Sequence, residues 1–235
     1  MKKPEIVSKQ QWLDKRQALL VKEKQLTRLR DEVSQQRQAM PWVKVDKQYE
    51  FEGASGKESL SALFAGKSQL LIYHFMLGPD WDEGCTSCSF WADNFNGIDI
   101  HLAHRDISFL VVSRAAYAKL DAYKKRMDWG FKWVSSLGSD FNYDYQVSFT
   151  PEQKEKNEIE YNYRTTPYFI DELVGVSVFA KDEQGDVFHT YSAYSRGVDM
   201  LNGAYNYIDL TPKGRDEHGD AKNMGWLRRH DQYDE

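Results

Sequence analysis

The stretch from Gln69 to Cys88 decides the fold of this chain. It opens with an apolar run, Gln69-Leu-Leu-Ile-Tyr-His-Phe75, passes through the loop Gly78-Pro-Asp-Trp-Asp-Glu-Gly84, and ends in Cys85-Thr-Ser-Cys88. The chain contains two cysteines, and both lie in this motif. Two intervening residues place both sulfurs on the first turn of a following helix, close enough to form one disulfide. The motif therefore predicts dithiol-disulfide chemistry at the end of a strand.

The composition is that of a soluble globular protein. The chain has 235 residues, of which 41% are hydrophobic and 29% charged, so it can bury a substantial core. Its net charge of -5 argues against a phosphate-binding surface, and we expect no nucleic-acid partner. We find neither a signal-peptide core nor a membrane span, so we expect no membrane partner and a cytoplasmic location. In that compartment a structural disulfide is disfavoured.

Residues 8–38 are predicted to form one long helix that closes before Pro41. Ser8 and Gln11 resemble a capping box, and apolar residues recur on one stripe. Polar residues at the companion heptad positions favour a helix docked on its own domain or on a twin subunit over a coiled coil, so a homodimer stays open. The stripe consists of Trp12, Leu19, Leu26, Leu29 and Val33.

Strands and helices then alternate. Predicted strands at 69–76 and 107–113 are separated by a helix from Cys85 to about Arg105, and a second helix runs from about Ala115 to Met127. Two further strands, 174–181 and 187–194, read as a hairpin before a final helical stretch near 198–207. This order, β-α-β-α-β-β-α, predicts an α/β protein with a thioredoxin-like three-layer sandwich.

Two regions lie outside that pattern. Residues 129–149 are rich in aromatics and read as an insertion whose rings pack in the core or line a pocket. The end of the chain is polar, and we expect it to be loosely held. We divide the chain into an N-terminal helical extension at 1–41, a thioredoxin-like domain at 42–210 and a polar C-terminal tail at 211–235.

The positions of the two cysteines predict different roles. A helix N-terminus favours a thiolate, which makes Cys85 the attacking thiol, and Cys88, one turn inward, the resolving thiol. Thr86 and Ser87 could donate hydrogen bonds to the thiolate. The loop acids oppose its charge, so the sign of the net pKa shift is open from the sequence; they are Asp80, Asp82 and Glu83.

A zinc site is the rival interpretation of the same cysteines. His101 and His104 follow on the same predicted helix, one residue short of the usual zinc-finger histidine spacing. A single helix from Cys85 to His104 would be about 28 Å long, too long for four ligands around one ion. The zinc reading requires a break, for which Asn96-Gly97 is the candidate place, so we expect neither a metal nor a cofactor.

Other polar residues are weaker candidates. His74 precedes the thiol loop and could approach Cys85, although a hydrogen-bonded core histidine is the commoner case; His189 reads as structural. Arg114 and Arg196 follow predicted strands and could contact an anionic substrate, although salt bridges are the commoner role.

With these residues in view, the chain resembles the DUF899 family, a thioredoxin-like group of undefined function, some of whose members are described as predicted dithiol-disulfide isomerases. The similarity implies a thioredoxin-like fold and a C-x-x-C site. The segments that carry it are Glu23–Asp31, Pro41–Asp46, Tyr73–Pro79, Gly84–Ser89, Arg105-Asp106, Val112–Arg114, Gly138–Asn142 and Tyr191–Gly197.

The chain departs from better-known thioredoxin-like proteins. Thioredoxins have Trp before the first cysteine and Gly-Pro between the two, whereas here Gly84 and Thr86-Ser87 stand there. The peroxiredoxin P-x-x-x-T-x-x-C pattern is absent, with Asp82 in place of the threonine. Thioredoxin-like enzymes place a cis-proline before the hairpin, and Gly175-Val-Ser-Val178 suggests Ser177 there instead.

We therefore expect a thiol-disulfide oxidoreductase or peroxiredoxin-like reductase that acts on a disulfide or peroxide and is served by a reducing partner. The alternative is a non-catalytic binding module whose cysteines are structural or bind metal. Cys85 and Cys88 are the predicted catalytic residues. The predicted substrate-binding residues are Trp81, Thr86, Ser87, Arg114 and Ser177.

Overall fold

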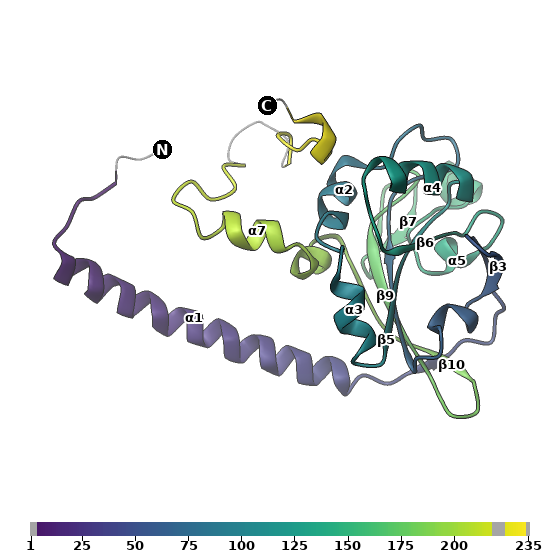
Figure 1. Cartoon of the computed structure of the whole chain (residues 1–235), viewed down its shortest axis with the longest axis horizontal. Helices are drawn as coiled ribbons and strands as arrows, with labels where there is room; N and C mark the ends of the chain where they lie inside the picture. Colours follow the sequence, from purple (N-terminus) through teal and green to yellow (C-terminus); the bar gives the residue numbers. More distant parts are fainter. Residues whose placement is uncertain (1–3, 218–223, 234–235) are drawn as a thin grey trace. The chain divides into compact units, whose positions relative to one another are not determined.

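The structure is a computed structural model that describes residues 4–217 and 224–233 (Figure 1). Its contacts divide the chain into two compact units, residues 1–41 and 42–235. The first unit contains one helix, α1, at Lys9–Gln38. Ser8 caps it, and the Ser8 and Gln11 side chains each accept a hydrogen bond from the other residue's backbone N–H, so the predicted capping box is confirmed. Taken alone, α1 buries none of its side chains.

The second unit is built on a mixed sheet. The central strand β4 (Gln69–His74) runs parallel to β5 (Ile107–Ser113), which is parallel to β6 (Lys132–Ser135). On its other side β4 is antiparallel to β9 (Gly175–Lys181), which pairs antiparallel with β10 (Val187–Tyr194). The predicted strand at 107–113 is confirmed, and so is the predicted hairpin, which is formed by β9 and β10. The strands at the two edges are β1 (Val43–Lys44) and β3 (Gly56–Ser59), and β2 (Glu50–Gly53) lies between β6 and β3.

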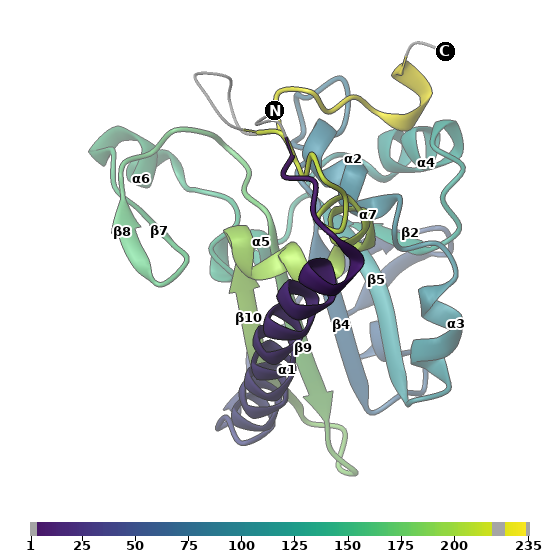
Figure 2. The ribbon, with the colours of Figure 1, turned by 90° about the vertical axis from the view of Figure 1, so that its left-hand side faces the viewer.

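In the described residues, the sheet has the order β1-β10-β9-β4-β5-β6-β2-β3 (Figures 1 and 2). A separate hairpin joins β7 (Ile159–Tyr161) to β8 (Arg164–Thr166). The aromatic segment 129–149 supplies β6 and the short helix α5 (Phe141–Asp144). Its Trp133, Phe141 and Tyr145 are buried, so core packing is the observed role of these rings.

The strand alternation of β4 feeds two cores, one on each face of the sheet. Leu70 and Ile72 join a cluster that includes the 3-10 helix Ala62–Phe64 and Phe141 of α5. Tyr73 and Phe75 point to the opposite face, where they pack with the helices that carry and surround the thiols. The site therefore lies on a rigid aromatic base on one face of the sheet. The described parts of this three-layer arrangement agree with the predicted fold class.

The helices differ from the sequence prediction in one respect that bears on the site. The predicted single helix from Cys85 to Arg105 is wrong, because the chain forms α2 (Thr86–Ala92) and α3 (Ile98–Ala103) with Gly97 between them. Gly97 has φ +84°, a left-handed conformation that glycine adopts without strain. Asn96 holds the break, accepting a hydrogen bond from the Gly130 N–H and donating one to the Asp128 carbonyl.

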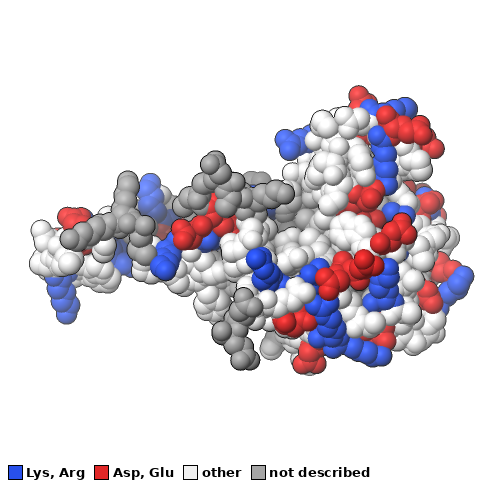
Figure 3. Space-filling view, turned by 90° about the horizontal axis from the view of Figure 1, so that it is seen from above, with Lys and Arg blue, Asp and Glu red and all other residues white. Residues whose placement is uncertain are grey.

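The remaining elements complete the thiol-bearing face. Helix α4 (Tyr117–Arg126) lies between β5 and β6 in the sequence and contributes Leu120 and Tyr123 to the core. The stretch predicted as one helix near 198–207 forms a 3-10 turn at Ser195–Leu201 followed by α7 (Gly203–Ile208). Two further short elements are α6 (Pro151–Lys156) and a 3-10 turn at His230–Gln232. On the face of residues 42–235 that Figure 3 shows, acidic and basic side chains are interspersed.

Candidate active site

The two thiols occupy the first turn of α2, as their spacing predicts. Cys85 is the N-cap residue and Cys88 lies three residues later inside the helix. The two cysteines lie 4.0 Å apart, and both are free thiols. A disulfide needs a sulfur-sulfur bond of about 2 Å, so its formation requires only a local approach of the two side chains.

Cys85 is partly exposed and sits among hydrogen-bond donors. The Cys88 thiol is the main cause that lowers the pKa of Cys85 to about 6, and the Ser87 hydroxyl and the backbone N–H groups of Ser87 and Cys88 act in the same direction. Burial opposes this shift. Ser87 Oγ lies 3.1 Å from Cys85 Sγ, so the predicted hydrogen bond from Ser87 is present. The lowered pKa increases the share of Cys85 that is thiolate at neutral pH.

Cys88 has the opposite character. Its side chain is buried, and burial together with the charge on neighbouring Cys85 raises the pKa of Cys88 well above its usual value. A buried neutral thiol beside a thiolate is suited to attack only after the first thiol has formed a bond to substrate. The greater shielding predicted for Cys88 is observed.

The loop that carries Cys85 is fixed by backbone and lysine contacts. The Cys85 N–H donates to the Met76 carbonyl at 3.0 Å. Lys119 of α4 donates to the carbonyls of Pro79 and Trp81 at 3.0 and 2.8 Å. The Trp81 ring packs against the core on this face and is not among the residues that line the cavity described below, so its role in substrate binding stays a prediction.

The end of the chain packs beside the thiols, which corrects the expectation of a loosely held tail. Leu227 is buried, and Arg229 donates to the Gly84 carbonyl at 2.7 Å and to the Tyr123 hydroxyl at 2.8 Å. The polar composition was misleading because one apolar side chain and one multidentate guanidinium are enough to anchor a short segment. Residues 218–223 of the predicted tail lie outside the described residues.

Arg229 also forms an ion pair with one acidic residue of the thiol loop, Glu83. Glu83 forms ion pairs with Arg126 and, at 2.9 Å, with Arg229. These contacts keep the pKa of Glu83 below its usual value, the Arg126 hydrogen bond being the main cause. The negative charge two residues before Cys85 is thus neutralised by arginines rather than left to oppose the thiolate.

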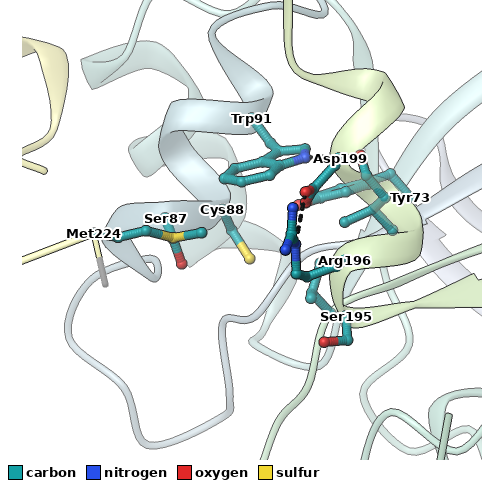
Figure 4. Close-up of a pocket in the computed structure, with 10 residues that line it drawn as sticks. Tyr73, Ser87, Cys88, Trp91, Ser195, Arg196, Asp199 and Met224 are labelled. Atoms are coloured by element: carbon teal, nitrogen blue, oxygen red, sulfur yellow. Dashed lines mark hydrogen bonds and ion pairs between the residues drawn. The ribbon is translucent and has the colours of Figure 1, made fainter. Parts of the chain in front are cut away.

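A cavity of about 160 Å³ opens beside Cys88 (Figure 4). Trp91 of α2 forms one wall and the Cys88 sulfur points toward the space. The rim carries the ion pair between Arg196 and Asp199, 3.1 Å apart. The remaining lining residues are Tyr73, Ser87, Val174, Ser195, Val198 and Met224.

Two predicted binding residues lie elsewhere. Ser177 lies inside β9 opposite Ile72, which packs on the other face of the sheet, and its hydroxyl bonds to His74 Nε2 and Ser192 Oγ at 2.9 Å each. The assignment of Ser177 to the cis-proline position is therefore wrong. Ser177 lies two residues inside β9, whereas Val174, the residue just before β9, lines the cavity. No cis peptide bond occurs within the described ranges.

Arg114 is engaged in a salt bridge with Glu172 at 2.9 Å and lies 4.5 Å from the centre of the Tyr143 ring. The structure thus supports the salt-bridge reading of Arg114, and its role in substrate binding stays a prediction. His74 is buried and stacks on Phe141, so it is the core histidine rather than a partner of Cys85. His189 likewise bonds to Ser192 within the hairpin.

The chain breaks between α2 and α3, at the place where a zinc site would require a break. Helix length therefore does not exclude a zinc site. The residues themselves still do not assemble a site. Within residues 4–217 and 224–233, no group of three or more His, Cys, Asp or Glu side chains is placed to hold a metal ion. No helix in those ranges is long and apolar enough to cross a bilayer.

The residues missed by the sequence come from distant segments. Arg229 and Met224 belong to the end of the chain, and Val174 and Val198 flank the hairpin. Tyr73 alone had a signal, because strand alternation places it on the same face as Phe75 and therefore under the thiol loop.

The order of the strands and the position of the two cysteines assign the protein to a class of fold. The strand order β5-β4-β9-β10, with a C-x-x-C motif opening the helix after the central strand, is a thioredoxin-like arrangement with a dithiol site. The chain belongs to the DUF899 family, described as "Bacterial protein of unknown function", whose model matches residues 1–233. No curated protein matches the chain.

Several of the solved structures that resemble this chain are named peroxiredoxins. A mutant of PrxQ from Xylella fastidiosa is 13% identical over 72% of this chain and 97% of its own, with a TM-score of 0.43. Peroxiredoxin Q from Xanthomonas campestris is 14% identical over 67% and 92%, with a TM-score of 0.43. The mitochondrial 2-Cys peroxiredoxin of Plasmodium falciparum is 14% identical over 72% and 94%, with a TM-score of 0.41. The fold assignment rests on the strand topology rather than on these likenesses.

Proposed function

We propose that this protein is a thiol-disulfide oxidoreductase in which Cys85 attacks and Cys88 resolves. The observation that carries the proposal is the unequal environment of two thiols 4.0 Å apart. One is partly exposed with a pKa lowered to about 6, and the other is buried with a raised pKa. A nucleophile must be a thiolate at working pH, and a resolving thiol must be near it but protected.

The reaction consists of two exchanges. The Cys85 thiolate attacks one sulfur of a disulfide, and the first thiolate leaves with a proton from solvent. Cys88 then loses its proton and attacks the Cys85 sulfur, releasing the second thiol and leaving a Cys85–Cys88 disulfide. A dithiol reductant returns the pair to its reduced form. A peroxide is the alternative oxidant. Cys85 then attacks one peroxide oxygen, the O–O bond breaks with release of an alcohol or water, and Cys88 attacks the resulting Cys85 sulfenic acid with release of water. A cytoplasmic location is part of the proposal.

The test is the reversible loss of two hydrogens. The folded chain is equilibrated in glutathione buffers of graded potential, free thiols are alkylated, and the intact mass is measured. As the buffer becomes more oxidising, we expect the number of alkylated cysteines per chain to fall from two to none in one transition. The Cys88→Ser variant is the control, since it cannot form the internal bond. If mild oxidation leaves both thiols alkylatable in the folded chain, the non-catalytic binding module becomes the better account.

A further inference from the structure

The cavity beside Cys88 has the dimensions and lining of a small-molecule site. Its volume of about 160 Å³ is close to that of an apolar cavity of ~150 Å³ that accepts benzene in another protein. Trp91, Val174 and Val198 give it apolar walls. The space is too small for a peptide chain or a peptide-sized thiol, but it accommodates a short alkyl group or one aromatic ring.

Tyr73 lines the cavity next to the resolving thiol. Its side chain is fully buried, and the Cys88 thiol interacts with its hydroxyl. Burial is the main cause that raises the pKa of Tyr73, and the charge of Cys88 and its hydrogen bond act in the same direction, so the hydroxyl stays protonated.

The two charged residues that line the cavity form an ion pair with each other. Arg196 and Asp199 pair with each other at the opening, so neither leaves a charge unopposed there (Figure 4). Ser87 connects the cavity to the nucleophile, because it lines the space and its hydroxyl lies 3.1 Å from Cys85 Sγ. Met224 closes the same side with a flexible side chain that can adapt to different substituents.

We propose that this cavity binds the apolar substituent of a low-molecular-weight disulfide, so that the substrate is a small neutral organic disulfide rather than a protein disulfide. The inference rests on the proposed function. The chemistry is the exchange already given: the substrate disulfide is reduced to two thiols, and Cys85 and Cys88 are oxidised to a disulfide.

The test compares each disulfide with itself in two proteins, so intrinsic reactivity cancels. Val174→Phe places a larger side chain in the cavity and keeps both cysteines, and Val43→Phe makes the same change at an exposed position in β1. Oxidation by dipropyl disulfide should slow at least tenfold in Val174→Phe, because excluding one methylene from an apolar pocket already costs a factor of about 10–200. Oxidation by oxidised glutathione should slow less than oxidation by dipropyl disulfide does, and Val43→Phe should react with both disulfides as the wild type does.

Wild-type protein supplies a second measurement that does not depend on the fold of a variant. Benzyl alcohol should compete with dipropyl disulfide and leave the glutathione reaction unchanged. If wild-type protein forms no internal disulfide with either reagent, the proposed function fails. If it does, but Val174→Phe and benzyl alcohol affect both disulfides equally or not at all, the oxidoreductase stands and the cavity is not its substrate site.

Discussion

The outer and inner ends of the first turn of α2 carry the same side chain in opposite states. At the outer end, Cys85 is partly exposed and receives hydrogen bonds that stabilise its anion. At the inner end, Cys88 is buried against Tyr73 and Trp91, and its pKa is raised. The comparison teaches that a C-x-x-C motif fixes the spacing of two thiols, whereas their roles depend on what surrounds each of them.

Substituting Gly84 should have the largest effect on the stability and geometry of the thiol site. A Cβ on this residue would lie 2.7 Å from Phe75 Cε1 and 2.8 Å from Tyr123 Cε1, and both rings are packed in the core. Gly84→Ala should lower the free energy of unfolding by about 1–3 kcal/mol, the usual cost of overpacking, and displace Cys85. Denaturant unfolding and the rate of Cys85 alkylation measure the two effects.

Gly130→Ala is the matched control, because the new Cβ would lie 3.8 Å from Asn96 Oδ1, an ordinary van der Waals distance. We expect that variant to unfold as the wild type does. Equal unfolding curves for Gly84→Ala and Gly130→Ala would show that the aromatic base under the thiol loop is not rigid.

Removing Arg229 should weaken the outer end only. Arg229→Ala loses the hydrogen bonds to the Gly84 carbonyl and the Tyr123 hydroxyl and one of the two ion pairs of Glu83. We expect a loss of about 1–3 kcal/mol in the free energy of unfolding. The pKa of Cys85 should rise, because the charge of Glu83 is less well neutralised.

Arg228→Ala is the control for that change, since within the described part of the chain the Arg228 guanidinium donates to the Gly225 and Leu227 carbonyls of its own segment. The pH profile of Cys85 alkylation separates the variants. A profile for Arg229→Ala that coincides with that of Arg228→Ala would mean that the end of the chain does not tune the site.

Ser87→Ala should change the pKa of Cys85 with little effect on packing. It removes one hydrogen bond to the Cys85 thiolate, and such bonds to charged groups contribute about 1.5–3 kcal/mol, so the pKa of Cys85 should rise by about one to two units. Thiolate absorbance against pH measures it. Thr86→Ala, the neighbouring residue also predicted as a donor, is the control; an equal rise in both variants would assign the effect to the helix turn.

The lowered pKa also fixes the sign of the pH dependence of stability. Because the folded pKa of Cys85, about 6, lies below the unfolded value of about 8.5, the thiolate stabilises the reduced fold fully above the unfolded value. That stabilisation is lost as the pH falls through about 6. The Cys85→Ser variant should lack this component of the pH dependence.

Local patterns predicted much of this molecule. Strand alternation located β4 and the hairpin, and Ser8 and Gln11 marked the start of α1, because these features depend on neighbours within a few residues. The sequence identifies Asn96-Gly97 as the place where the helix could break, but it does not predict that the break occurs. Periodicity alone does not show that Asn96 accepts a hydrogen bond from Gly130. Arg229, Val174 and Met224 were missed because only the folded chain brings them to the thiols.

The most direct test of the account is to trap the first covalent intermediate. Cys88→Ser and Cys85→Ser proteins are incubated with dipropyl disulfide at neutral pH, and the intact masses are followed with time. The account predicts that Cys88→Ser accumulates a long-lived propylthio adduct on Cys85, whereas Cys85→Ser stays unmodified over the same period. Equal adducts on the two variants would contradict the assigned order of attack, and an adduct only on Cys85→Ser would reverse it.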